Sequence, residues 1–281
     1  MLFKRVDLYE YFGLTRPEKG AGYLDCYVAA PSVSYPARIR PAMLVIAGGG
    51  YQGVSDREKE CIAFTFLAQG FCAFALEYSV SPVHYPAQLI EGCMAMAYIR
   101  ENAAEFRIDE NHVGVTGFSA GGHLAAMLAT IYDEKEVKTV LGHKVSLCRP
   151  DAAVLAYPVI SSGEKAHFGS FDSLCGDDLG LKERLSLEKR VTSDSVPAFI
   201  WATANDGAVP SENSLMLAAA YKENGVPFEL HVFENGVHGL SLATEETGNV
   251  NAPVAAWVGL CITWLKSHGF TVCDAIKKRE V

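Results

Sequence analysis

The stretch HVGVTGFSAGGHLAAMLAT, residues 112–130, contains a G-x-S-x-G motif at residues 117–121. The run 112–116 is short, apolar and β-branched, which favours a strand, whereas residues 120–131 carry Ala, Leu and Met at helical spacing. The motif therefore predicts a sharp strand-turn-helix connection that exposes the hydroxyl of Ser119, with flanking glycines that let the strand and helix approach. The alternative is a serine that only caps the helix.

Two later residues favour a catalytic interpretation of Ser119. A serine hydroxyl becomes a good nucleophile only when a base removes its proton, and an acid must orient that base. Asp206 follows an apolar strand pattern at residues 198–203, and His238 lies in a glycine-bounded loop after the strand-like run 228–233. Because each residue follows a strand and the chain order is serine, acid, histidine, the sequence predicts a catalytic triad of Ser119, Asp206 and His238.

A glycine-rich loop, GGGY at residues 48–51, follows a buried strand pattern and predicts an oxyanion hole. Glycines let the backbone approach a substrate closely, so its N–H groups can stabilise the negative oxygen of a tetrahedral intermediate. One donor is expected from Ala120, the residue after the nucleophile. The other is expected from Gly49 or Gly50, with Tyr51 as a further candidate.

The same loop also satisfies G-x-G-x-x-G at residues 48–53, which is typical of dinucleotide-binding folds. Ser55 and Glu58 form an S-x-x-E pattern that predicts a capping box at the next helix, and Glu77 in the following strand could hold a ribose hydroxyl. A nucleotide site would nevertheless leave the ordered serine, acid and histidine without a role. We therefore predict that the chain needs no cofactor.

The sequence resembles the α/β-hydrolase-fold esterases, specifically the small acetyl esterases that include acetylxylan esterases. The resemblance extends from about Ile39 to Gly269 and is carried, beyond the G-x-S-x-G turn, by GGGYQGVSDREKE, FALEYSVSP, YPVISSGEKAHFGS, LSLEKRVTSDSVPAFIWATANDGAVPSENSL and PFELHVFENGVHGLSLA. It implies the same triad and places the oxyanion loop at Gly48–Tyr51. Many of these esterases have a histidine before the three glycines, where this chain has Ala47. This departure is expected to affect loop rigidity and acyl preference, because the backbone donors remain.

The resemblance implies an α/β-hydrolase fold, and the alternating strand and helix patterns predict a mostly parallel eight-stranded sheet with helices on both faces. With 281 residues, 49% of them hydrophobic, the chain can bury a large core, and we expect a single domain over residues 1–281. Apolar and polar residues alternate over residues 23–28, which predicts a half-buried antiparallel strand before the parallel series. Residues 157–196 interrupt the regular pattern, so we expect a partial cap there that shapes substrate choice.

Composition restricts the compartment and the partners. The eight cysteines include no C-x-x-C pair, and the chain opens with the charged MLFKRVDLYE, so we expect reduced thiols and a cytoplasmic location. No apolar run reaches the length of a membrane span, and the net charge of -9 argues against nucleic acid. A homo-oligomer is compatible with the sequence, although no pattern selects one.

The eight histidines show no H-E-x-x-H or other compact metal-ligand spacing, so no metal is expected. His123 lies one helical turn beyond Ser119, and we expect it to pack in the core and not to take part in the chemistry. His167, in the expected cap, is the better candidate for a substrate contact. Residues 87–102 show a helical pattern whose sulfur-containing side chains are typical of a core.

The function predicted from these residues is a serine hydrolase that cleaves short-chain carboxylic esters through an acyl-enzyme. The resemblance to acetyl esterases, and not the triad, implies a small-molecule ester of an acetylated sugar, such as an acetylated xylo-oligosaccharide. The triad alone would serve a general carboxylesterase, a peptidase or a thioesterase equally well. A non-catalytic binding protein of the same fold is a further alternative, but such proteins are expected to lack a triad member.

Overall fold

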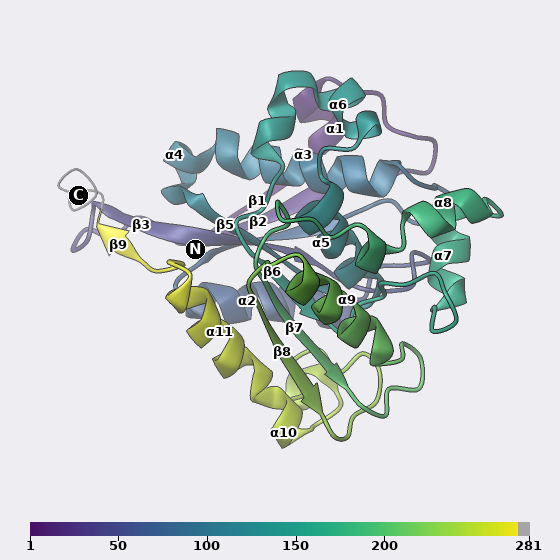
Figure 1. Ribbon diagram of the computed structural model, residues 1–281. Coiled ribbons are helices and arrows are strands. Elements are labelled where there is room, and N and C mark those ends of the chain that lie inside the picture. The colour runs from purple at the N-terminus through teal and green to yellow at the C-terminus, as the bar shows by residue number, and fades with distance from the viewer. Residues whose placement is uncertain (275–281) are drawn as a thin grey trace.

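One sheet carries the loops on which the candidate site is expected (Figure 1). The computed structural model describes residues 1–274. Its strands are β1 (Leu2–Asp7), β2 (Tyr23–Val28), β3 (Arg38–Ile46), β4 (Cys72–Glu77), β5 (Ile108–Phe118), β6 (Ala153–Ala156), β7 (Ala198–Thr203), β8 (Phe228–Phe233) and β9 (Cys273–Asp274). Eight of them follow the order β1-β2-β4-β3-β5-β6-β7-β8, and β9 pairs with β3. The pairs from β4 to β8 are parallel, whereas β1, β2 and β9 pair antiparallel.

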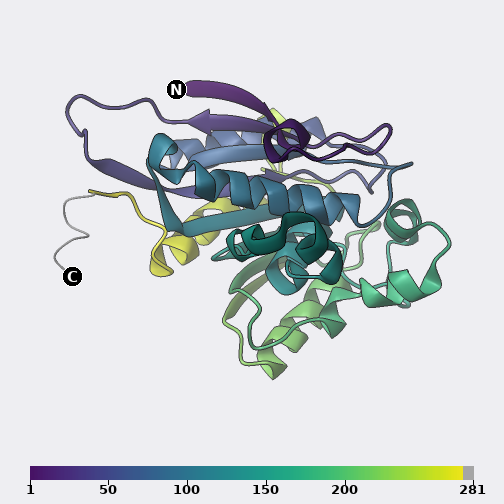
Figure 2. The same cartoon turned by 90° about the horizontal axis from the view of Figure 1, so that it is seen from above.

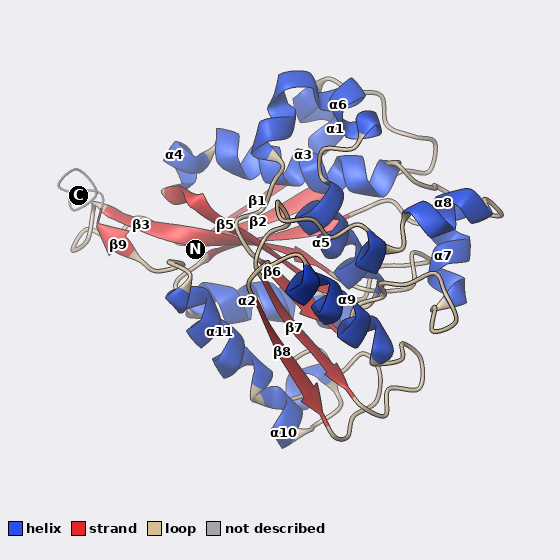
Figure 3. Ribbon diagram, in the orientation of Figure 1, coloured by secondary structure: helices blue, strands red, loops and turns tan. Residues whose placement is uncertain are grey.

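Helices cover both faces of this sheet, as Figures 2 and 3 show. The α-helices are α1 (Leu8–Phe12), α2 (Glu60–Ala68), α3 (Ala87–Glu101), α4 (Ala103–Phe106), α5 (Ala120–Ile131), α6 (Lys135–Leu141), α7 (Phe168–Cys175), α8 (Leu179–Arg184), α9 (Glu212–Glu223), α10 (Ala252–Ala255) and α11 (Trp257–Ser267). Four 3₁₀ turns complete the described chain: η1 (Asp56–Glu58), η2 (Gly142–Leu147), η3 (Leu187–Lys189) and η4 (Glu245–Thr247). The fold is an α/β-hydrolase fold, in agreement with the sequence-based prediction.

The central strands divide their side chains between two apolar layers. In β3, Leu44 and Ile46 join the layer that contains α3, α5 and α9, while Met43 and Val45 join the layer that contains α2 and α11. This division follows from the two-residue period of a strand, and both sets are apolar because helices cover both faces. The near-continuous hydrophobic runs of the sequence are therefore the strands of a buried parallel sheet.

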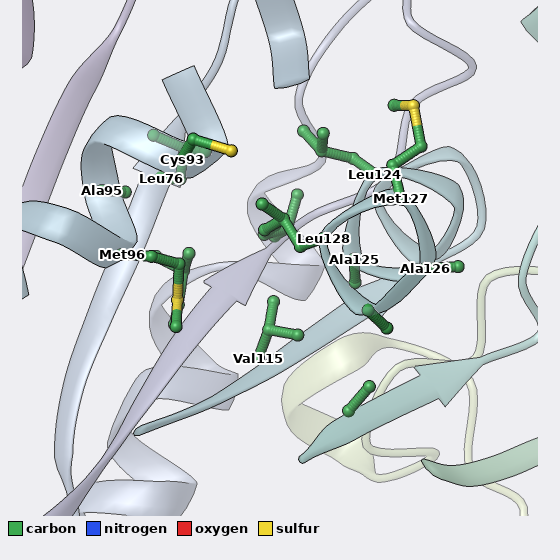
Figure 4. Packing of buried hydrophobic residues seen from close by; sticks show 14 of the residues in the cluster. Leu76, Cys93, Ala95, Met96, Val115, Leu124, Ala125, Ala126, Met127 and Leu128 are labelled. Atoms are coloured by element: carbon green, nitrogen blue, oxygen red, sulfur yellow. The ribbon is translucent and has the colours of Figure 1, made fainter. Parts of the chain in front are cut away.

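The layer between α3 and α5 forms much of the core beneath the G-x-S-x-G turn (Figure 4). Met96 of α3 and Leu128 of α5 are fully buried, and they lie in the same cluster as Leu76 of β4 and Val115 of β5. Burying each of these side chains favours folding by about 1.5–3 kcal/mol. The expectation that residues 87–102 contribute to a core is confirmed, and the packing gives the serine turn a rigid base.

The antiparallel edge differs from the sequence-based prediction. The strand expected at residues 23–28 is present, but its polar face is not exposed, because Asp25 and Tyr27 are both buried. Lys59 Nζ lies 3.3 Å from Asp25 Oδ2, and the Tyr27 hydroxyl donates to Glu60 at 2.9 Å. The half-buried assignment was wrong because the residues around the start of α2 cover this face. The sequence analysis also missed β1 and the two-residue β9.

Three further observations concern the expected compartment and ligands. The free thiols are those of Cys26, Cys61, Cys72, Cys93, Cys148, Cys175 and Cys261. Within residues 1–274, no helix combines the length and the apolar composition required to cross a bilayer. In the same part of the chain, we find no group of three His, Cys, Asp or Glu side chains arranged to hold a metal ion.

Candidate active site

Ser119 lies on a tight turn between β5 and α5, as its flanking glycines predicted. Its backbone is strained, with φ of 54° and ψ of -119°. A Cβ atom on Gly117 would lie 2.2 Å from the carbonyl oxygen of Gly121, and one on Gly121 would lie 2.3 Å from that of Ala47. Only glycine fits at both positions, because the backbones themselves are in contact. The turn therefore presents the serine side chain to the loops at the carboxyl end of the sheet.

The structure brings Ser119, Asp206 and His238 together from three separate strands. Asp206 follows β7 and His238 follows β8, while Ser119 follows β5. His238 Nε2 lies 2.8 Å from Ser119 Oγ, and His238 Nδ1 lies 2.7 Å from Asp206 Oδ2. A carboxylate can only accept, so Nδ1 carries the proton and Nε2 is left to accept from the serine hydroxyl. The three side chains form one continuous hydrogen-bonded chain.

The environment of Asp206 keeps its carboxylate ionised. Its side chain is buried, and Oδ1 accepts hydrogen bonds from the N–H groups of Ala208 and Val209 at 2.9 and 3.0 Å. Burial alone would raise the pKa of Asp206, but the hydrogen bond and charge of His238, together with the two N–H donors, lower it below its usual range. A permanent negative charge therefore faces the imidazole ring.

The loop at residues 48–51 passes directly over the serine turn. A Cβ on Gly48 would lie 2.7 Å from the carbonyl oxygen of Phe118 and 2.9 Å from Ser119 Cβ. Gly49 and Gly50 adopt positive φ values of 131° and 64°, and Tyr51 adopts 57°. These conformations explain the glycines and show why the backbone can come so close to the serine.

The candidate oxyanion donors differ in whether their N–H groups are available. The N–H of Gly48 donates to Glu58 Oε2 at 2.8 Å, so it is already occupied. Within residues 1–274, we find no hydrogen bond from the N–H groups of the four residues that the sequence analysis selected, namely Gly49, Gly50, Tyr51 and Ala120. Unpaired donors beside a serine side chain are the feature that an oxyanion hole requires.

The loop is fixed without a histidine at position 47. The Tyr78 hydroxyl donates to the carbonyl oxygen of Ala47 at 2.8 Å, and the N–H of Ser81 donates to that of Tyr51 at the same distance. Together with the bond from Gly48 to Glu58, these contacts hold both ends of the glycine run. The backbone of the loop is thus anchored by groups that the motif itself does not contain.

His123 supports this loop from the core. Its ring is fully buried, and Nε2 lies 2.9 Å from the carbonyl oxygen of Leu185, so Nε2 carries the proton. Nδ1 then accepts from the Tyr51 hydroxyl at 2.9 Å. Burial lowers the pKa of His123 to about 4. The ring is therefore neutral at pH 7 and lies in the core, where the sequence analysis expected it.

A pocket of about 320 Å³ opens in front of Ser119 and His238. His167 lines it from the residue before α7, and its Nδ1 lies 2.8 Å from Ser170 Oγ. Burial, followed by the nearby charge of His238, lowers the pKa of His167, so its ring is neutral at pH 7. The expected substrate-contact candidate thus lies in the pocket, together with the glycine loop. Figure 1 shows α7 and α8 side by side at this end of the sheet.

Five other residues line the pocket that the sequence analysis did not assign to the site, namely Gln52, Ser55, Arg57, Glu58 and Gly239. The capping box expected from two of them is wrong. Ser55 makes no side-chain cap hydrogen bond, and α2 begins only at Glu60, after the short turn η1. Glu58 instead turns its carboxylate toward the glycine loop. The S-x-x-E pattern predicted that the Glu58 carboxylate accepts a backbone hydrogen bond, which it does, but the donor is the Gly48 N–H and not that of Ser55.

The chain is similar to several known proteins. The family model BD-FAE matches residues 24–161. The crystal structure of the acetyl ester-xyloside bifunctional hydrolase from Caldicellulosiruptor lactoaceticus is 36% identical, with a TM-score of 0.81, over 95% of this chain and 97% of that chain. The chain belongs to the α/β-hydrolase esterases, in the acetylxylan esterase-like group.

Two curated relatives of this α/β-hydrolase esterase are longer proteins. Endo-1,4-beta-xylanase B of Butyrivibrio fibrisolvens is 38% identical over 214 residues, which are 74% of this chain and 33% of the relative. The acetylxylan esterase of Xylanibacter ruminicola is 28% identical over 214 residues, which are 72% of this chain and 42% of the relative. The esterase chain therefore spans less than half the length of either curated relative.

Proposed function

We propose that this protein is a serine carboxylic ester hydrolase in which Ser119 is the nucleophile, His238 the general base and Asp206 the acid that orients it. The observation that carries the proposal is the continuous hydrogen-bonded chain from Asp206 through His238 to Ser119 Oγ, on a strained turn beside unpaired N–H donors. This arrangement supplies a nucleophile, a base and stabilisation for a developing oxyanion in one place.

The reaction proceeds in two halves. His238 Nε2 takes the hydroxyl proton as Ser119 Oγ attacks the ester carbonyl, and the negative charge of the tetrahedral intermediate lies against the N–H groups of Ala120 and the glycine loop. The imidazolium then gives its proton to the departing alcohol, which leaves an acyl-enzyme. In the second half, His238 takes a proton from water, the resulting hydroxide attacks the acyl group, and the proton returns to Ser119 as the acid is released. Asp206 stabilises the imidazolium in both halves.

The substrate class proposed is an acetyl ester of a small carbohydrate, such as an acetylated xylo-oligosaccharide. Support comes from the relatives, two of which are named an acetylxylan esterase and an acetyl ester-xyloside bifunctional hydrolase. The pocket of about 320 Å³ at Ser119 and His238 has room for a small ester substrate. We further assign the segment 157–196, which contains α7, α8 and η3, as a partial cap within a single domain, with His167 as its substrate-contacting residue.

The proposal is tested by hydrolysis of p-nitrophenyl esters from acetate to octanoate, run beside an acetylated xylo-oligosaccharide. We expect acetate to be preferred, the oligosaccharide to release acetate, and Ser119→Ala to abolish both reactions while it keeps a native circular dichroism spectrum. The matched control is Ser211→Ala, because the Ser211 side chain makes no cap hydrogen bond at the start of α9. Turnover by purified Ser119→Ala at the wild-type rate would refute the nucleophile. Preference for octanoate would refute the short-acyl assignment.

A further inference from the structure

Glu58 is a buried carboxylate that belongs to neither the triad nor the oxyanion donors. Its side chain is 3% exposed although it lines the pocket, and it comes from η1, directly after the glycine loop. A Cβ placed on Gly48 would lie 2.8 Å from Glu58 Oε2 and 2.9 Å from Ser119 Cβ, so the carboxylate and the serine flank the same point. Oε2 accepts the hydrogen bond from the Gly48 N–H, which fixes the start of the loop.

The other oxygen of this carboxylate reaches the loop that carries His238. Tyr157, at the end of β6, donates its hydroxyl hydrogen to Glu58 Oε1 at 2.6 Å. The same hydroxyl accepts from the N–H of Ser241, three residues after His238, at 2.9 Å. The Tyr157 ring also packs edge-on against the His238 ring, with 5.1 Å between the ring centroids. One tyrosine therefore joins the carboxylate both to the imidazole ring and to the backbone beyond it.

A second contact closes this connection on the other side. The hydroxyl of Ser241 donates to the carbonyl oxygen of Arg57, the residue before Glu58. Ser241 is buried and has a positive φ of 52°, so its own loop is tightly constrained. The segment that follows the glycine loop and the segment that follows His238 are thus joined at two points.

We propose that Glu58 is a positioning residue for the esterase reaction: its carboxylate holds the oxyanion loop through Gly48, and holds His238 through Tyr157, in their reacting geometry. The inference rests on the proposed function, because it assigns a role relative to Ser119 and His238. An oxyanion hole stabilises a transition state only when its donors are already in place, so a group that fixes both the donors and the base acts directly on kcat.

The charges around Glu58 are consistent with this role. Burial raises the pKa of Glu58 above its usual range, and the Tyr157 hydroxyl, the Gly48 N–H and the positive charge of His238 offset only part of that rise. Burial and the neighbouring carboxylate raise the pKa of Tyr157 well above its ordinary value, so its hydroxyl stays protonated and donates. When His238 becomes an imidazolium, a negative charge on Glu58 adds to that of Asp206.

The chain offers a matched control in Glu91. This glutamate is also buried and accepts from a backbone N–H, that of Ser79 at 2.6 Å, and from a tyrosine hydroxyl, that of Tyr9 at 2.9 Å. Burial raises its pKa as well. Glu91 does not line the pocket at Ser119. Replacing it removes an equivalent buried carboxylate without touching the site.

The experiment compares kcat and KM for p-nitrophenyl acetate in wild type, Glu58→Gln, Tyr157→Phe, the double variant, Glu91→Gln and Ser119→Ala, with a thermal unfolding curve for each. We expect Glu58→Gln to lower kcat by about 10- to 100-fold with KM within about threefold of wild type. The double variant is expected to match Glu58→Gln within about twofold, because both changes break the same connection. Glu91→Gln is expected to lose stability and keep kcat.

Three results would overturn the inference. The first is a folded Glu58→Gln enzyme with wild-type kcat. The second is a loss of kcat in Glu91→Gln that has the same relation to its loss of stability as in Glu58→Gln, and the third is a double variant whose loss of kcat is the product of the two single losses. If Glu58→Gln does not fold, Tyr157→Phe tests the inference instead, because it leaves the carboxylate in place. A wild-type kcat in Tyr157→Phe would then contradict the role of Glu58. Activity in Ser119→Ala would instead contradict the proposed function. An active wild type, an inactive Ser119→Ala and an unaffected Glu58→Gln would contradict only the role of Glu58.

Discussion

Glu58 and Glu91 are chemically similar groups in two different regions of the molecule. Each is buried, and each accepts hydrogen bonds from a backbone N–H and a tyrosine hydroxyl. Glu58 joins the glycine loop to the loop of His238, whereas Glu91 on α3 joins Tyr9 of α1 to Ser79, the second residue after β4. The same local chemistry therefore organises reacting groups in one region and chain packing in the other. Which of the two it does depends on what the partner tyrosine touches.

The partners of the two tyrosines make this difference concrete. Tyr157 packs against His238, while Tyr9 packs beneath the guanidinium of Arg16, 5.5 Å from its ring centroid. The Ser79 hydroxyl, which donates to Glu91, also accepts from the N–H of Ala21 at 2.9 Å. The Glu91 cluster thus fixes the segment between α1 and β2. Variants in the two regions should separate activity from stability.

The largest effect is expected from a third buried carboxylate, Asp206. Asp206→Asn keeps the size of the side chain but removes the charge and allows the amide to select the wrong tautomer of His238, so kcat should fall by roughly 10³-fold or more. Steady-state kinetics on p-nitrophenyl acetate measures this fall in kcat. Glu91→Gln, whose kcat should be unchanged, is the control. A fall of less than tenfold in a folded variant would contradict the assigned role of Asp206.

The second effect concerns pH and His123, which supports Tyr51 from the core. Because the pKa of His123 is lowered to about 4 in the folded state, the unfolded chain binds a proton first as the pH falls below about 6.5. Stability is therefore lost between about pH 6.5 and 4, at up to about 1.4 kcal/mol per pH unit from this group, and is fully present above that range. His123→Gln retains an acceptor and a donor but cannot titrate.

Urea unfolding at pH 7.5 and pH 5.0 checks this prediction. Between the two pH values, the free energy of unfolding of the wild type should fall by about 2 kcal/mol more than that of His123→Gln. The contributions of all other titrating groups cancel in this difference. Equal losses in both proteins would show that His123 is not buried in its neutral form. Glu91 does not explain such a loss, because burial raises its pKa. The folded chain therefore binds this proton first, and protonation of Glu91 favours the folded state as the pH falls.

The smallest effect is expected from the tyrosine of the Glu91 region. Tyr9→Phe removes one of the hydrogen bonds to a buried carboxylate and should lower the free energy of unfolding by about 1–3 kcal/mol. Its kcat should equal that of the wild type, in contrast to Tyr157→Phe. Chemical denaturation and the acetate assay on the same preparation give both values. A reduced kcat in Tyr9→Phe would erase the distinction between the two regions.

Local patterns were sufficient to predict the parts of the site that depend on neighbouring residues. The strands at 198–203 and 228–233 and the helix at 120–131 have the predicted bounds, because their apolar residues follow a strand or helix period without interruption. The positions of Asp206 and His238 follow from these bounds, since carboxyl ends of parallel strands meet at one edge of the sheet. The glycines around Ser119 predicted a close approach of backbone segments, and the structure contains it.

Contacts between distant segments could not be predicted in the same way. The S-x-x-E pattern at Ser55 and Glu58 fits a local cap, and nothing near it in the sequence indicates Tyr157, 99 residues away. Similarly, the alternation at residues 23–28 indicates an exposed polar face, but Lys59 covers Asp25 from a segment that sequence alone does not place there. In both cases, the partner of the polar residue lies in a segment that is distant in the sequence.

The distances along the chain also determine when the site can exist during synthesis. The serine and histidine are 119 residues apart, and the bond between Ser241 and Arg57 spans 184 residues. Contacts of this separation form late, because the intervening chain must first be ordered. A chain emerging from the ribosome would thus gain ester-cleaving ability only after β8 and the segment beyond it have joined the sheet. The time at which ester hydrolysis begins during translation would then report when these segments have folded.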